Sequence, residues 1–174
     1  MPGQHPIRGG FAGAMLLLSV AGLAGCDGFD GVSGTPDHLE RTTDPEVLQR
    51  GERLYQEHCI ACHGAQREGA EDWRQRNSDG TLPPPPLDGS AHTWHHPYWQ
   101  LKDIIRYGAE ARGGAMPSFE DTLSEDDVES IIAWLQSHWP DEIFEAWTRY
   151  DRNHPTQADW EEAMDEAWVT HADD

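Results

Sequence analysis

The chain contains very little positive charge. Lys102 is its single lysine, and 12 Lys and Arg residues stand against 32 Asp and Glu residues, which gives a formal net charge of -20. Phosphate backbones and anionic lipid headgroups repel a chain of this charge. The composition therefore excludes charge-driven binding to nucleic acid or to a membrane surface. An acidic chain of this kind can still bind partner proteins that have a basic docking surface.

Long hydrophobic runs are also missing. The longest apolar stretch covers residues 11–24, after Arg8, and is shorter than the roughly 20 residues that a membrane-spanning helix needs. Its position and composition predict a signal peptide over residues 1–25. The stretch ends in LAGC at positions 23–26, which resembles the bacterial lipoprotein signal. The resemblance implies lipidation of Cys26, export, and anchorage on the periplasmic side of a bacterial membrane; a plain secretory signal with an incidental cysteine is the alternative.

Only three cysteines are present, and two of them, Cys59 and Cys62, lie three positions apart directly before His63. A zinc ribbon would need a second cysteine pair, and a thioredoxin-like motif would need a βαβ context. Residues i and i+3 share one face of a helix, so both thiols can form thioethers with the two vinyl groups of one porphyrin. The motif predicts one covalently bound haem c with His63 as an iron ligand. A redox or adventitious CxxC is the alternative.

Alternating, strand-like windows are absent, which predicts an all-α domain. We expect its first helix to begin at a capping box formed by Thr43 and Glu46, with Pro45 in the first turn, and to run into the haem motif. Gly51 interrupts the apolar stripe of this helix at a cost of about 1 kcal/mol relative to alanine. It therefore indicates a close helix crossing.

Two further helices are expected. The second should cover residues 97–107 and stop at Gly108 in a left-handed conformation. The third should start at Ser124 and Asp127 and end before Pro140.

Residues 44–139 resemble a class I monohaem cytochrome c, with the haem motif early, a methionine loop later and an amphipathic helix at the end. The resemblance implies a small cytochrome c fold of three main helices around one haem. In that family the first and last helices cross through a glycine and an aromatic residue. Gly51, Tyr55 and Trp134 occupy the matching places in this chain.

The expected organisation has four parts. They are a lipoprotein signal peptide over 1–25, a flexible tether over 26–42, a cytochrome c domain over 43–139 and an acidic, aromatic C-terminal extension over 140–174. The extension carries two rows of apolar residues at helical spacing, namely Ile143, Phe144, Trp147 and Tyr150, and then Trp160, Met164 and Trp168. Such rows either dock on their own domain or bind a partner protein.

Methionine supply narrows the choice of the sixth iron ligand. Two of the four methionines leave with the predicted signal peptide, so Met116 and Met164 remain. Met116 lies in a glycine- and proline-containing segment, 113–119, that resembles the methionine loop of the cytochromes, and it is the predicted ligand opposite His63. Met164 is expected to pack in a helix. The alternative ligands are His92, His95, His96 and His138, and the first three of these could also bind a transition metal, although without carboxylate support.

The same resemblance implies further haem contacts. In cytochromes c a proline carbonyl accepts the second ring N–H of the haem histidine, which orients and strengthens this ligand. Pro85 is the candidate within the run of four prolines at 83–86. Trp94 is a candidate donor to a haem propionate, and Arg106 or Arg112 could pair with one.

Ligation by His63 and Met116 decides the expected function. A low-spin iron with both axial positions filled does not readily bind oxygen, peroxide or an organic substrate, and a thioether ligand raises its reduction potential. The sequence predicts electron transfer by a membrane-tethered cytochrome between respiratory or dehydrogenase partners, with no catalytic residues. One alternative is a haem-based sensor or peroxidase-like enzyme in which Met116 is labile. The other is a cytochrome subunit of a larger oxidoreductase.

Overall fold

The computed structural model describes residues 37–159 and 161–162. The chain divides between Ser33 and Gly34 into two units, and every described residue belongs to the second. The predicted signal peptide, Cys26 and most of the predicted tether lie outside the described residues, as do Trp160, Met164 and Trp168.

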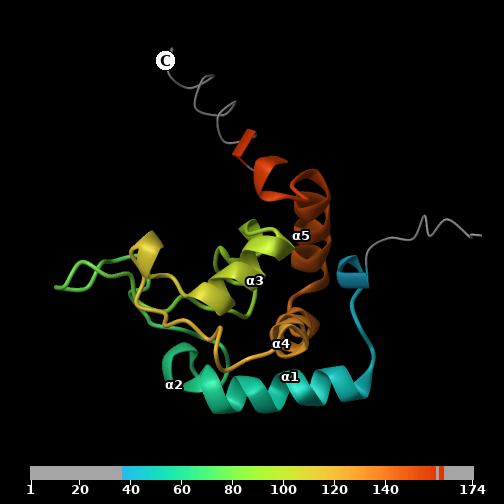
Figure 1. The fold of residues 1–174 in the computed structure, drawn as a ribbon, viewed down its shortest axis with the longest axis horizontal. Helices are drawn as coiled ribbons and strands as arrows, with labels where there is room; N and C mark the ends of the chain where they lie inside the picture. The colour runs from blue at the N-terminus through green and yellow to red at the C-terminus, as the bar shows by residue number, and fades with distance from the viewer. Residues whose placement is uncertain (1–36, 160, 163–174) are drawn as a thin grey trace, which may run out of the picture. The chain divides into compact units, whose positions relative to one another are not determined.

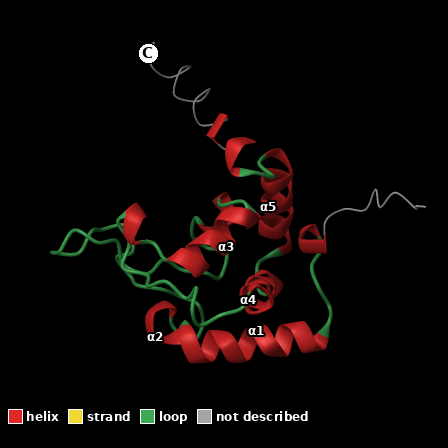
Figure 2. Ribbon diagram, viewed as in Figure 1, coloured by secondary structure: helices red, strands yellow, loops and turns green. Residues whose placement is uncertain are grey.

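Helices joined by loops form the whole of this described part, with no strand in it (Figure 2). The α-helices are α1 (Pro45–His58), α2 (Ile60–His63), α3 (Tyr98–Tyr107), α4 (Glu125–Ser137) and α5 (Asp141–Asn153), with short 3-10 turns at Asp37–Leu39, Thr93–His95 and Glu110–Arg112 (Figure 1). An isolated bridge pairs Leu82 with Gly114. The predicted all-α fold is confirmed.

The N-cap of helix α1 lies one residue later than predicted. The side chain of Asp44, and not that of Thr43, caps the helix by accepting a hydrogen bond from the Glu46 N–H at 2.9 Å. Aspartate is at least as good an N-cap as threonine, and the cap at Asp44 places Pro45 at the first helical position, where proline is favoured. The prediction of a Thr43–Glu46 capping box is therefore wrong, although the predicted helix is present.

Helices α1 and α4 cross at Gly51, as the sequence predicts (Figure 1). A Cβ atom on Gly51 would lie 2.1 Å from the carbonyl oxygen of Ser130 and 2.6 Å from the Cβ of Trp134. Next to this contact the ring of Tyr55, 1% exposed, lies 4.8 Å from that of Trp134. The crossing holds the end of α1, and so the haem motif that follows it, against the C-terminal half of the domain.

The other two predicted helices are present as well. Helix α3 ends at Gly108, whose φ of 79° is in the region that favours glycine. Helix α4 starts with the expected capping box between Ser124 and Asp127. The apolar face of α4 forms the centre of the core, and its most deeply buried members are Val128, Ile131 and Ile132.

Helix α5 forms the beginning of the C-terminal extension, and it covers its own apolar face by packing on the domain. Trp147 is 0% exposed, and its indole N–H donates to the carbonyl oxygen of His96 at 3.0 Å. Phe144 is buried beside it, with ring centroids 5.6 Å apart. The first of the two apolar rows in the extension is therefore used inside this chain.

Residues 37–41, the described end of the predicted tether, also pack on this part of the fold. Leu39 is buried in the core, and the Arg41 guanidinium donates to the carbonyl oxygen of Trp139 at 2.8 Å. His38 Nε2 lies 2.9 Å from Oδ2 of the buried Asp151 in α5. None of the described helices is long and apolar enough to cross a membrane.

We expect Asp151→Ala to lower the free energy of unfolding by about 2 to 3 kcal/mol. Asp151 is 3% exposed and accepts the Tyr98 backbone N–H at 2.5 Å as well as facing His38, so alanine leaves both donors without this partner. Urea denaturation at neutral pH measures the loss. Asp151→Asn, which keeps an acceptor oxygen for Tyr98, should lose clearly less, and equal losses in the two variants would contradict this role.

Candidate haem-binding site

The CxxCH motif forms a turn at the junction of two helices. Cys59 caps the C-terminus of α1, and its carbonyl oxygen accepts the backbone N–H groups of Cys62 at 3.1 Å and of His63 at 2.9 Å. Both cysteines are free thiols. Burial, followed by the nearby Cys62, raises the pKa of Cys59 to about 11. The two sulfurs and the imidazole are thus held on one short helical turn.

His63 is buried, with 8% of its surface exposed, and its Nδ1 atom lies 3.0 Å from the carbonyl oxygen of Pro85. Burial lowers the pKa of this imidazole, while the contact with Pro85 acts in the opposite direction. A neutral ring that donates from Nδ1 to a carbonyl carries its free lone pair on Nε2. In that tautomer Nε2 is the ring nitrogen that is free to accept a hydrogen bond or to bind a metal.

The loop after the CxxCH motif and the proline run 83–86 lie on either side of this imidazole and come into close contact at Gly69. A Cβ atom on Gly69 would lie 2.4 Å from the carbonyl carbon of Pro85, and its φ is 64°. The loop after the haem motif is also joined to the proline run by the Ala70 N–H, which donates to the Pro84 carbonyl oxygen at 2.9 Å. The Tyr55 hydroxyl donates to the carbonyl oxygen of Gly64 at 2.8 Å and fixes the start of that loop to α1.

The segment around Met116 is anchored to the end of α3 and to the start of the proline run. The Ala109 N–H donates to the Met116 carbonyl oxygen, and the Phe119 N–H donates to that of Arg106, each at 3.0 Å. The Leu82 N–H donates to the Gly113 carbonyl oxygen at 2.8 Å. Met116 itself is half-buried. The loops that carry Pro85 and Met116 are therefore tied to each other and to α3.

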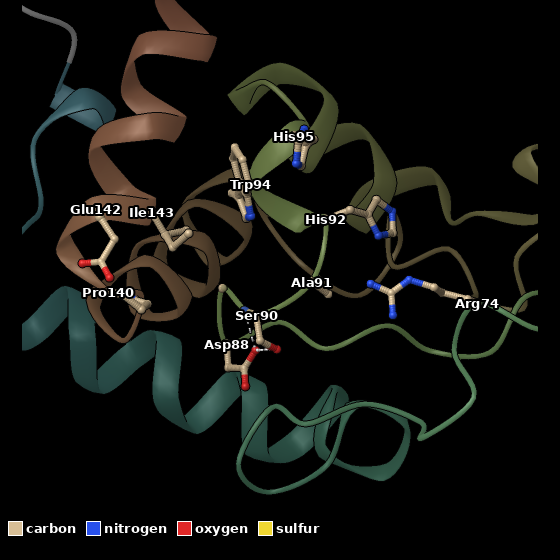
Figure 3. Close-up of a pocket in the computed structure, with 11 residues that line it drawn as sticks. Arg74, Asp88, Ser90, Ala91, His92, Trp94, His95, Pro140, Glu142 and Ile143 are labelled. Atoms are coloured by element: carbon tan, nitrogen blue, oxygen red, sulfur yellow. Dashed lines mark hydrogen bonds between the residues drawn. The ribbon is translucent and has the colours of Figure 1, made fainter.

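Trp94 is a further predicted haem contact. It lines a cavity of about 660 Å³ between residues 88–95 and the start of α5, which Arg74, His92, His95 and Ile143 also line (Figure 3). Cys59, Cys62, His63 and Met116 do not line this cavity. The role of Trp94 as a haem contact stays a prediction, as does pairing of Arg106 or Arg112 with a propionate.

The four alternative histidine ligands have other partners. His92 stacks on Trp73 with ring centroids 5.0 Å apart, His95 lies against Trp94, His96 Nδ1 lies 3.1 Å from Gln100 Oε1, and His138 Nδ1 lies 2.8 Å from the Trp134 carbonyl oxygen. Within the described residues no group of three or more His, Cys, Asp or Glu side chains is arranged to hold a metal ion. The described part of the chain thus shows no such group at His92, His95 and His96.

The donor chemistry of these residues fits a covalently bound haem. Cys59 and Cys62 supply two unpaired thiols, and His63 supplies one nitrogen lone pair with its other nitrogen occupied. Met116 supplies a thioether on an anchored loop.

Comparison with known proteins identifies the family. Residues 46–135, just over half of the chain, match the family model described as "Cytochrome C oxidase, cbb3-type, subunit III". The chain belongs to this family. As a member of the cbb3-type subunit III family it is a c-type cytochrome, with the haem c and the electron-transfer role that a cytochrome c domain implies.

Two curated relatives are much longer proteins that match this chain over a short part of their own length. The chain is 28% identical to a nitrite reductase of Stutzerimonas stutzeri, over 55% of this chain and 16% of that protein. It is 32% identical to the quinohemoprotein alcohol dehydrogenase ADH IIB of Pseudomonas putida, over 55% of this chain and 12% of that protein. The match thus spans less than a fifth of either relative. No solved structure gives a significant match.

Proposed function

We propose that this protein is a one-electron carrier in which a single haem c, bonded to Cys59 and Cys62, is ligated by His63 and Met116. The observation that carries the proposal is the 3.0 Å contact between His63 Nδ1 and the Pro85 carbonyl oxygen on a buried imidazole. Because Nδ1 is engaged in this contact, Nε2 is the ring nitrogen whose lone pair is free to bind iron. Redox proteins are the partners expected of such a carrier.

Each of the four side chains has a distinct task in this proposal. The bound haem supplies a reversible one-electron iron couple. Cys59 and Cys62 fix its position on the turn after α1, and His63 gains basicity as a ligand because its Nδ1–H donates to Pro85. Met116 would hold the haem iron through its thioether, from a loop that Ala109 and Phe119 hold on α3. With His63 and Met116 both bound to it, the haem would pass electrons without readily taking up small ligands.

A second candidate is a cytochrome module that serves a larger oxidoreductase. Both curated relatives carry the matching segment as a small part of a protein named for an enzymatic activity. The chemistry of the haem site would be the same in this role. The difference lies in the partner, which would be a catalytic subunit and not a diffusing carrier. Stable co-purification of the native, detergent-extracted protein with one catalytic subunit would favour this candidate.

We further propose that the protein is exported and anchored on the periplasmic side of a bacterial membrane through lipid at Cys26, with residues 26–42 as the segment that joins the anchor to a cytochrome c domain over 43–139. The LAGC sequence at 23–26 supports the anchor. After membrane extraction, intact-protein mass spectrometry should show a diacylglycerol adduct on Cys26, and Cys26→Ser should move the protein to the soluble fraction. An unmodified mature chain that begins at another residue would refute the anchor.

Replacement of Met116 tests the electron-carrier proposal. The oxidised wild-type protein should show a sulfur-to-iron charge-transfer band in its optical spectrum, and Met116→Ala should abolish it and convert the iron to a high-spin form, because the thioether ligand is gone. Met164→Ala is the matched control, since Met164 is the other methionine after the predicted signal peptide, and it should keep the band. A band that survives Met116→Ala, or is absent from the wild type, would contradict the proposed ligation.

A further inference from the structure

Four consecutive backbone carbonyls beside His63 each accept a hydrogen bond from a different part of the molecule. We call these carbonyls, of residues 84–87, the acceptor row. Their donors are Ala70 N–H to Pro84 at 2.9 Å, His63 Nδ1–H to Pro85 at 3.0 Å, the Thr93 hydroxyl to Pro86 at 3.0 Å, and the Trp139 indole N–H to Leu87 at 2.9 Å. The contact with His63 is therefore one member of an ordered set.

The acceptor row depends on donors from elsewhere because of its composition. Residues 83–86 are all proline and have no backbone N–H, so they contribute acceptors alone to the hydrogen-bond network. An extended proline run has no internal hydrogen bonds to hold it in place. Because each peptide unit is planar and each proline φ is fixed, a rotation that moves one carbonyl also moves its neighbours. The direction of the Pro85 carbonyl is consequently set from both sides.

On the C-terminal side, two buried side chains outside the haem motif supply the donors. Thr93 is 8% exposed and lies in the 3-10 turn Thr93–His95, and Trp139 is 3% exposed and follows α4. The indole of Trp139 is held in turn by Trp147 of α5, with ring centroids 6.0 Å apart. Thr93 therefore holds the carbonyl next to that of Pro85, and Trp139, which packs on α5, holds the one after it, that of Leu87.

We propose that Thr93 and Trp139 are positioning residues, which hold the Pro85 carbonyl against His63 Nδ1 and so set the strength of this imidazole as an iron ligand. The inference rests on the proposed role of His63 as the haem ligand. Loss of the Thr93 hydroxyl leaves the Pro86 carbonyl without its donor in the protein interior, and an orphaned buried acceptor reorients to find another partner. That reorientation weakens the neighbouring contact with His63. A weaker Nδ1–H donation makes the imidazole less basic and stabilises the ferric form less.

The test uses the ferrous holoprotein labelled with 15N-histidine. In Thr93→Val, which keeps the shape of the side chain, the His63 Nδ1–H should exchange with solvent at least tenfold faster than in the wild type. At one fixed ambient potential, the ratio of ferric to ferrous protein should fall about threefold. Thr93→Ser restores the hydroxyl and should return both values close to those of the wild type. Trp139→Phe should shift both in the same direction as Thr93→Val.

Thr148→Val is the matched control, because the Thr148 hydroxyl also donates to a backbone carbonyl, that of Glu145 in α5, at 3.0 Å. It should change neither value. The Thr93→Val and Trp139→Phe variants could lose stability and still keep wild-type exchange at His63 Nδ1 and a wild-type ferric-to-ferrous ratio. That result would overturn this inference and leave the proposed ligation standing. Wild-type His63 ring protons without the large shifts of a haem ligand would overturn the proposed ligation together with it.

Discussion

We expect the replacement of both Cys59 and Cys62 by serine to leave the protein without covalently attached haem. The two thiols lie on one turn, with the Cys62 and His63 N–H groups both bonded to the Cys59 carbonyl oxygen, and neither thiol is paired in a disulfide. A serine hydroxyl does not form the thioether that joins the chain to a haem vinyl group. The intact mass of the wild-type protein should therefore exceed that of the mature chain by one haem, and the double variant should show the chain mass alone after denaturation.

The single variants and a third cysteine provide the controls. Cys59→Ser and Cys62→Ser should each retain haem through one bond, at reduced yield, whereas Cys26→Ser should leave covalent attachment intact, since Cys26 lies outside the motif. A wild-type protein whose mass shows no haem, with Cys59 and Cys62 oxidised to a disulfide, would establish the redox CxxC that the sequence left as the alternative.

Gly51→Ala is the substitution with the largest expected effect on the fold. The added Cβ would meet the backbone oxygen of Ser130 at 2.1 Å and the Cβ of Trp134 at 2.6 Å, and no rotation of a side chain can relieve a contact with backbone. The gain of about 1 kcal/mol in helix propensity is outweighed, because overpacking at a rigid contact costs about 3 kcal/mol or more. Helices α1 and α4 must separate, so we expect a net loss of at least about 2 kcal/mol in the free energy of unfolding.

Urea denaturation of the holoprotein measures this loss. The control is Glu52→Ala, which places the same alanine one position further along α1 on an exposed site and should change stability by less than about 0.5 kcal/mol. A Gly51→Ala variant as stable as the wild type would contradict the close crossing.

The helices of the cytochrome domain were predictable because each carries its own local signals. Gly108 ends α3 and the Ser124 capping box starts α4, and both are properties of a few neighbouring residues. The start of α1 was misplaced by one residue because Thr43 and Asp44 are both good caps, and only the folded chain shows which one bonds to Glu46. Such competition between adjacent residues cannot be settled from their types.

The site was predictable where its residues are adjacent and not where they are distant. Cys59, Cys62 and His63 form a contiguous motif, and the position of Pro85 follows from a family resemblance. Trp139 reaches the Leu87 carbonyl across 52 positions, and Asp151 reaches His38 across 113. One sequence contains no signal that pairs residues so far apart, so the connection of α5 to the acceptor row and to the segment 37–41 came from the structure.

Rapid mixing of the oxidised wild-type protein with cyanide tests the central claim most directly, namely that His63 and Met116 close both axial positions. The optical spectrum should change slowly, at a rate that becomes independent of cyanide concentration, because Met116 must leave first; Met116→Ala should react at once. Immediate uptake of cyanide by the wild type, at a rate proportional to its concentration, would show an open iron position and would contradict the assignment of this protein as an electron carrier.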